Sequence, residues 1–222
     1  PLVEDGTLPP VDERLPDNPL VVEPVDSIGK YGGTWRSGLR GRGDNAWISR
    51  TLNYDGLVRY NREWDEIIPN LAESWEVSED GKTITFTMAE GHTFASGNPV
   101  TAKDAEFSLR RAVELNKTPS FILTQFGFTP ENVEETIVAE DDKTLVLKLD
   151  KQYAVSFVLN CLTATIGGIV DMETVMEHEE DGDMGNAWLR TNHPRVGALE
   201  RQYSSALGKT FKMAIRGLAL GA

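Results

Sequence analysis

Hydrophobic and polar residues alternate in two stretches of the chain, and each stretch predicts a β-hairpin. The first covers residues 74–88, where alternating side chains flank an acidic turn that ends in Gly81. The second covers residues 135–149 and turns across two aspartates and a lysine. A short strand is expected at 34–36, and an apolar run at 165–170 is typical of a buried strand.

The helical pattern is clearest after Thr101. This residue and Asp104 have the spacing of a capping box, and the apolar residues behind them recur every three or four positions. The pattern predicts a helix that runs to about Asn116, and further helices are expected at 153–161 and 171–180. Strands and helices therefore mix along the chain, which predicts an α/β or α+β body without repeats.

The two ends of the chain differ from this body. Residues 1–30 hold six prolines and little periodicity, which predicts an extended arm lying over the body. Residues 1–192 carry a net charge of −17, whereas residues 193–222 carry +4. So abrupt a reversal indicates that the last thirty residues have a different origin or a different role.

Composition excludes several classes of protein. The 222 residues are 40% hydrophobic and 26% charged, which is ordinary for a folded chain. The formal net charge of −13 repels phosphate backbones and anionic lipid, so we expect no nucleic-acid partner. The most apolar stretch, at 157–170, is interrupted by polar residues and a glycine pair, so we expect no membrane insertion.

Candidate chemistry is sparse. His92, His178 and His193 lack a second His or Cys at metal-ligand spacing, so we expect neither a metal site nor a cofactor. Cys161 is the only cysteine and lies among apolar residues, where packing is a better interpretation than nucleophilic chemistry. The chain also lacks a nucleophile elbow and a distinctive carboxylate pair, so we expect no enzymatic activity.

One long stretch carries a resemblance. The segment PNLAESWEVSEDGKTITF, at residues 69–86, resembles the opening signature of family 5 extracellular solute-binding proteins. These are the dipeptide, oligopeptide and nickel receptors of ABC importers. The similarity covers about residues 15–192, and Ala89 and Ser96 are local departures from it: the family usually has Arg or Lys at the first position and Asp or Asn at the second. Its other matching segments lie at 18–22, 28–34, 90–94, 96–104, 107–111 and 183–189.

The resemblance implies a fold and a function. It implies a periplasmic-binding-protein-like fold of class II, of which residues 31–192 would be the first lobe with its extra hairpin-rich subdomain. The implied function is a periplasmic, exported component of an ABC importer, which captures peptide-like solutes and delivers them to permease subunits. The alternative is a stand-alone fragment of the first lobe that acts as an interaction module or has no function.

Family members are more than twice as long as this chain and fold as two lobes that close on a ligand. The resemblance therefore predicts a truncated or frameshifted copy whose residues 193–222 are not family sequence. The alternative is a genuine variant tail that forms a basic amphipathic helix. A single lobe would expose apolar surface, which predicts self-association.

The resemblance also implies a ligand-facing wall made of three loops. Cys161 and Thr163 could instead pack beneath the cleft, and Trp47 and Phe121 could instead be core residues. The residues expected to line the wall are Asn45, Ala46, Trp47, Ser120, Phe121, Cys161, Leu162, Thr163 and Thr165.

Overall fold

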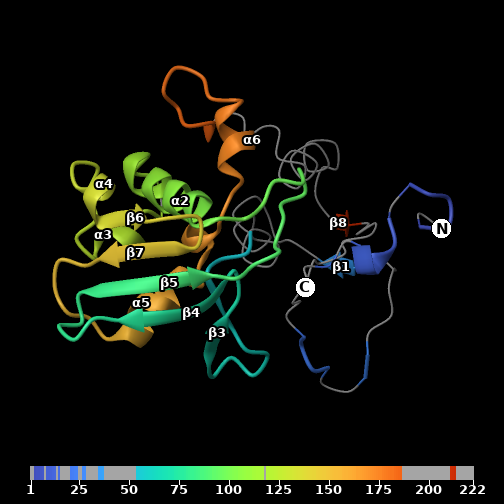
Figure 1. Cartoon of the computed structure of the whole chain (residues 1–222), viewed down its shortest axis with the longest axis horizontal. Helices are drawn as coiled ribbons and strands as arrows, with labels where there is room; N and C mark the ends of the chain where they lie inside the picture. Colours follow the sequence, from blue (N-terminus) through green and yellow to red (C-terminus); the bar gives the residue numbers. More distant parts are fainter. Residues whose placement is uncertain are drawn as a thin grey trace.

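A mixed α/β body makes up most of the described structure (Figure 1). This computed structural model describes residues 3–7, 9–13, 15, 21–24, 27–28, 35–37, 54–117, 119–186 and 211–213. No helix in these ranges is long and apolar enough to cross a membrane.

The body is organised around a four-stranded antiparallel sheet in the order β4-β5-β7-β6. Both predicted hairpins are confirmed, because β4 pairs with β5 and β6 pairs with β7. The two hairpins join through β5 and β7, where Phe86 lies opposite Leu145. The strands are β4 (Ala72–Val77), β5 (Thr83–Met88), β6 (Ile137–Ala139) and β7 (Thr144–Lys148).

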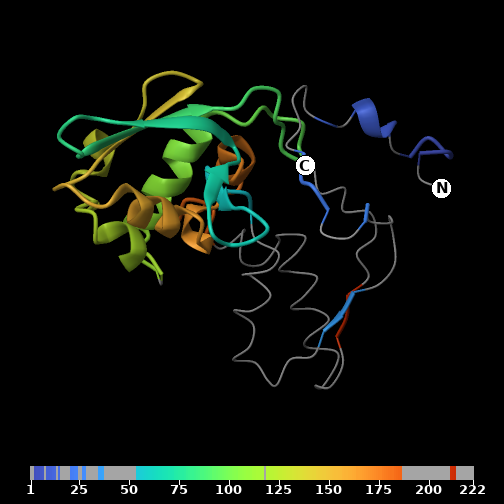
Figure 2. The same ribbon diagram turned by 90° about the horizontal axis from the view of Figure 1, so that it is seen from below.

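Alternation along β5 decides which face of the sheet is covered. Ile84, Phe86 and Met88 are at most 2% exposed, while the threonines between them are only partly buried. Figure 2 shows the helices drawn in green and orange on one side of the sheet. A bulge in β4 places Ala72 opposite Met88 on the covered face, and Trp75 opposite Phe86. One face of the sheet therefore carries the core.

Helix α2 (Ala102–Glu114) covers part of this face and confirms the predicted helix after Thr101. The Asp104 carboxylate accepts hydrogen bonds from the Thr101 backbone amide at 2.9 Å and the Thr101 hydroxyl at 2.7 Å. Asp104 also accepts from the Met172 amide at 3.0 Å. The same carboxylate thus begins α2 and attaches the first residue of α6 (Met172–Met176).

The remaining elements are short. A second antiparallel pair, β2 with β3, precedes the main sheet, and β1 pairs antiparallel with β8. These strands are β1 (Trp35–Ser37), β2 (Val58–Tyr60), β3 (Ile67–Pro69) and β8 (Phe211–Met213). The helices are η1 (Val11–Glu13), α3 (Phe121–Thr124), α4 (Val133–Thr136), α5 (Val155–Leu162), η3 (Thr165–Gly167) and α6 (Met172–Met176).

One expectation about local structure is wrong, and one alternative does not hold in the described part of the tail. The strand expected at 165–170 is a turn of 3-10 helix, η3, followed by a single bridge between Gly168 and Gly56. A Cβ on Gly167 would lie 2.0 Å from the Leu162 carbonyl oxygen, so the chain turns back on α5 here instead of extending. The alternative of a helical tail does not hold at Phe211–Met213, because these residues form β8.

Candidate functional site

The first candidate loop begins α3. Ser120 is 5% exposed, and its hydroxyl donates to the Asn116 side-chain oxygen at 3.0 Å. The Ser120 carbonyl accepts from the amides of Leu123 and Thr124 at 2.9 and 3.1 Å. Ser120 therefore shapes the turn, while the next side chain, Phe121, is 64% exposed and is available for contact.

An aromatic cluster holds α3 against α5. Phe126 is fully buried, and its ring meets Tyr153 edge to face at a centroid distance of 5.0 Å. It also meets Phe157 of α5 at 5.5 Å. The Tyr153 hydroxyl donates to the Gln125 carbonyl at 2.7 Å. These contacts fix the loop after α3 relative to the start of α5.

A side-chain contact brings two of the sequence-predicted loops together. Gln125 ends α3, and its side-chain amide donates to the Cys161 sulfur at 3.6 Å. Burial raises the pKa of the Cys161 thiol, and the Gln125 hydrogen bond opposes this only in part. The thiol therefore stays protonated at neutral pH and is a poor nucleophile.

The end of α5 leads into the other predicted site residues. Leu162 is 2% exposed and belongs to the core, so its side chain supports this surface from beneath. The Thr163 hydroxyl donates to the Asn160 carbonyl at 2.7 Å, which closes the end of the helix. Thr165 is exposed at the start of η3. We call the six residues Ser120, Phe121, Cys161, Leu162, Thr163 and Thr165 the α3–α5 surface.

The third predicted loop, Asn45-Ala46-Trp47, lies outside the described residues. Two residues beside the α3–α5 surface were missed by sequence reasoning. Gln125 joins α3 to Cys161, and Asn160 donates from its side chain to the Tyr60 hydroxyl. Both contacts join residues at least 36 positions apart, so no local pattern could have signalled them.

The buried carboxylate of Asp171 is held in the body by hydrogen bonds from uncharged groups. Asp171 is 9% exposed and accepts from the Ser96 and Thr174 hydroxyls, both at 2.6 Å, and from the Asn98 amide group at 3.2 Å. Burial alone would raise the pKa of this carboxyl, but the hydrogen bonds together hold it below the ordinary value. An ionised, fully bonded carboxylate is suited to fixing structure, not to proton transfer.

No group of three or more His, Cys, Asp or Glu side chains within the described ranges could hold a metal ion. The α3–α5 surface offers one exposed aromatic ring, that of Phe121, and one exposed hydroxyl, that of Thr165, which are groups that can contact a small solute.

Comparison with known proteins gives this surface a context. Residues 66–194, more than half of the chain, match the family described as bacterial extracellular solute-binding proteins, family 5 middle. The chain belongs to this family. The resemblance found in the sequence is thereby confirmed.

Three relatives illustrate the similarity. The periplasmic alpha-galactoside-binding protein of Rhizobium meliloti is 34% identical over 152 residues, which are 60% of this chain and 21% of that protein. The dipeptide-binding protein DppE of Bacillus subtilis is 34% identical over 128 residues, which are 52% of this chain and 23% of DppE. A solved structure of the oligopeptide-binding protein OppA aligns with a TM-score of 0.58 at 30% identity, over 86% of this chain and 31% of OppA.

The similarity to OppA confirms the expected fold class, a mixed α/β fold of the periplasmic binding protein type. The chain spans between a fifth and a quarter of the length of these two curated relatives. The names of all three relatives describe binding proteins.

Proposed function

We propose that this chain serves as a substrate-binding component of an ABC importer and captures peptide-like solutes outside the inner membrane for delivery to the permease. The observation that carries the proposal is the family match over residues 66–194. We further propose a periplasmic location, because the relative from R. meliloti is named as a periplasmic protein. The chain would bind its solute unchanged and catalyse no reaction.

The proposed contact region is the α3–α5 surface together with Asn45-Ala46-Trp47. Phe121 offers an exposed ring for apolar parts of the solute, and Thr165 offers an exposed hydroxyl. The Ser120 and Thr163 hydroxyls already donate to groups of the chain, so their part is to fix the loops. Leu162 and Cys161 support the surface from below.

We propose that residues 31–192 are the solute-binding part, preceded by an arm at 1–30 and followed by the basic tail at 193–222. The β4–β5 and β6–β7 hairpins lie within this part and would form its hairpin-rich subdomain.

Peptide-like solutes are the first candidates, because DppE and OppA are named for dipeptide and oligopeptide binding. α-Galactosides are the second, because the relative from R. meliloti is equally similar over a longer stretch.

A thermal-shift series on the full chain tests the proposal. A solute that binds only the native state raises Tm in a concentration-dependent manner. The series contains dipeptides, a pentapeptide mixture and an α-galactoside, each raised to millimolar concentration. A rise with a peptide supports the proposal, and a rise with the galactoside alone would correct the solute class. No rise with any of them would overturn solute capture by this chain.

Two variants locate the site. Phe121→Ala should reduce the ligand-induced shift in Tm, because it removes the exposed ring. Val77→Ala, at a 37% exposed position of β4, is the matched control and should leave the shift unchanged. Equal shifts in both variants would contradict the assignment of the α3–α5 surface.

A further inference from the structure

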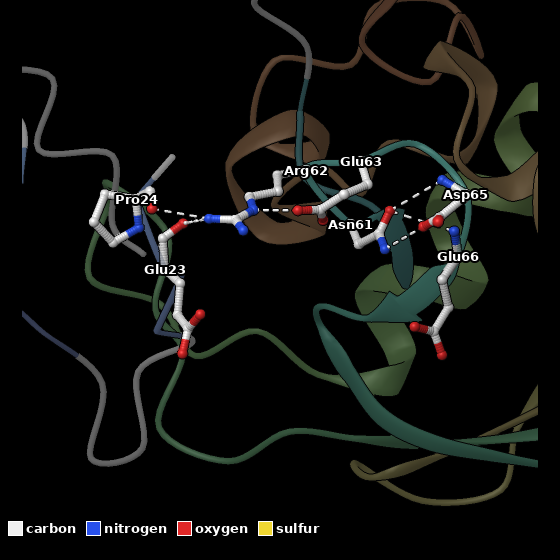
Figure 3. A network of polar contacts seen from close by, with 7 residues as sticks. All are labelled: Glu23, Pro24, Asn61, Arg62, Glu63, Asp65 and Glu66. Atoms are coloured by element: carbon white, nitrogen blue, oxygen red, sulfur yellow. Dashed lines mark hydrogen bonds and ion pairs between the residues drawn. The ribbon is translucent and has the colours of Figure 1, made fainter. Parts of the chain in front are cut away.

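Arg62 holds two consecutive carbonyl groups of a distant part of the chain (Figure 3). One terminal nitrogen of its guanidinium donates to the Glu23 carbonyl and to the Pro24 carbonyl, both at 2.9 Å. These partners are 39 and 38 positions away in the sequence. A guanidinium can make this pair of contacts because its donors lie in a fixed planar fork.

The hydrogen bonds that Arg62 makes to this segment go to main-chain carbonyls, and the negative charge of the Glu23 side chain adds an electrostatic attraction. Val21 and Val22 are 81% and 53% exposed, and Glu23 and Pro24 are exposed as well. Pro24 fixes its own φ and biases Glu23 toward an extended conformation. The segment therefore presents to Arg62 the groups that any extended peptide has.

The loop that carries Arg62 is braced on the other side. The Asn61 side-chain oxygen accepts from the Asp65 and Glu66 amides at 3.2 and 3.3 Å, and its amide group donates to the Asp65 carboxylate at 2.7 Å. The Arg62 guanidinium also donates to the carboxylate of Glu63. The Glu63 carboxylate thus helps to orient the guanidinium toward the distant segment.

A stacked pair of rings adds to this brace. Trp64 has a φ of 63°, in the left-handed region that a tryptophan rarely adopts. Its ring stacks on Tyr60 at a centroid distance of 5.2 Å, and Tyr60 in turn accepts from Asn160 of α5. The loop between β2 and β3 is therefore tied to the body that bears the α3–α5 surface.

We propose that the loop between β2 and β3, residues 61–66, is a docking site for an extended stretch of main chain, and that residues 21–24 of the same chain occupy it. Arg62 binds the segment through hydrogen bonds to main-chain carbonyls, so the docking depends little on which side chains the segment carries. The site attaches residues 21–24 to the body of the same molecule.

Limited proteolysis of the full chain tests this proposal. Elastase cleaves extended chain after small aliphatic residues, and the Val21–Val22 bond lies within the docked segment. Arg62→Ala should raise the initial cleavage rate at this bond about 5- to 30-fold, the change in an open-to-docked ratio that one or two kilocalories produce. Arg59→Ala, at an exposed position of β2, is the matched control and should leave the rate unchanged.

Two further outcomes decide the nature of the contact. Glu23→Ala should raise the cleavage rate much less than Arg62→Ala does, because it removes only a charge attraction and keeps both hydrogen bonds from Arg62 to the main chain. Protection should also be independent of protein concentration, because the occupant belongs to the same molecule. An unchanged rate in Arg62→Ala, a rate in Glu23→Ala as fast as that in Arg62→Ala, or protection that disappears on dilution would each overturn the proposal.

Discussion

Asp171 connects two parts of the body, and its removal gives a sharp test of how that body is held together. Its carboxylate accepts from Ser96 and Asn98, in the loop between β5 and α2, and from Thr174 in α6. It is also the N-cap of α6, because it accepts from the Thr174 backbone amide at 3.2 Å. Asp171→Ala therefore removes a long-range connection and a helix cap together.

The expected cost follows from these contacts. Loss of an N-cap side chain costs about 0.5–2 kcal/mol. Hydrogen bonds to a charged group contribute about 1.5–3 kcal/mol. Ser96 is exposed, so its released hydroxyl can bond to water, and this reduces the loss. We expect Asp171→Ala to lower the free energy of unfolding by about 2–3 kcal/mol. Urea denaturation followed by tryptophan fluorescence measures this change.

The pH dependence gives the same prediction a second test. Because the hydrogen bonds hold the pKa of Asp171 below its ordinary value of 3.8, ionisation of this carboxyl stabilises the folded state at neutral pH. This contribution is complete above the unfolded-state pKa and is lost as the pH falls through the folded-state pKa. The difference between wild type and Asp171→Asn should therefore shrink from pH 7 to pH 3.

Glu173→Ala is the matched control, since Glu173 lies in the first turn of the same helix and its side chain is exposed. It should change the free energy of unfolding by less than about 0.5 kcal/mol. The reasoning is refuted if Asp171→Ala costs no more than this control, or if the difference between wild type and Asp171→Asn is the same at pH 3 and pH 7.

Three other predictions concern the core and the candidate site. Gly167→Ala should destabilise the protein by about 3 kcal/mol, because the added Cβ meets the Leu162 carbonyl oxygen at 2.0 Å; a neutral result in urea denaturation would contradict the turn at η3. Phe86→Ala should cost about 3–5 kcal/mol because the ring is fully buried, whereas Phe121→Ala, at a 64% exposed position, should cost under about 1 kcal/mol in the same assay. Cys161 should react with a disulfide reagent more slowly than a free thiol at pH 7 and titrate above its ordinary pKa of 9.0, and rapid labelling at pH 7 would show that the thiol is not buried as described.

The elements that the sequence predicts well are those whose patterns lie within a few neighbouring residues. Alternation in residues 83–88 and the acidic turn before them specify the first hairpin, since both a period of two and a turn residue are visible within a few positions. Thr101 and Asp104 mark the start of α2 in the same way. In each case the pattern and the observed contacts come from neighbouring residues.

Sequence patterns are less informative where contacts with distant residues determine the local structure. The apolar run at 165–170 has the composition of a strand, but Gly167 lies against the Leu162 carbonyl and the run forms only one bridge, with Gly56. Ser96 is a similar case, because it departs from the residue usual in the family. Its hydroxyl donates to Asp171, 75 positions away; an asparagine at this position could also donate, but an ionised aspartate could not.

The candidate site was predictable in part. The resemblance singled out the residues at the start of α3 and the end of α5, but not Gln125, which joins them. The aromatic contacts of Phe126 that hold α3 against α5 likewise involve residues up to 31 positions apart, and only the fold reveals them.

The most direct test of the account is a titration of the isotopically labelled full chain with a dipeptide mixture, followed by amide chemical shifts. Solute capture by the α3–α5 surface predicts saturable shifts at residues 120–121 and 161–165, and smaller or no shifts in β4. Saturable shifts confined to other parts of the body would contradict the site. The absence of shifts up to millimolar peptide would contradict capture of peptide-like solutes by this chain.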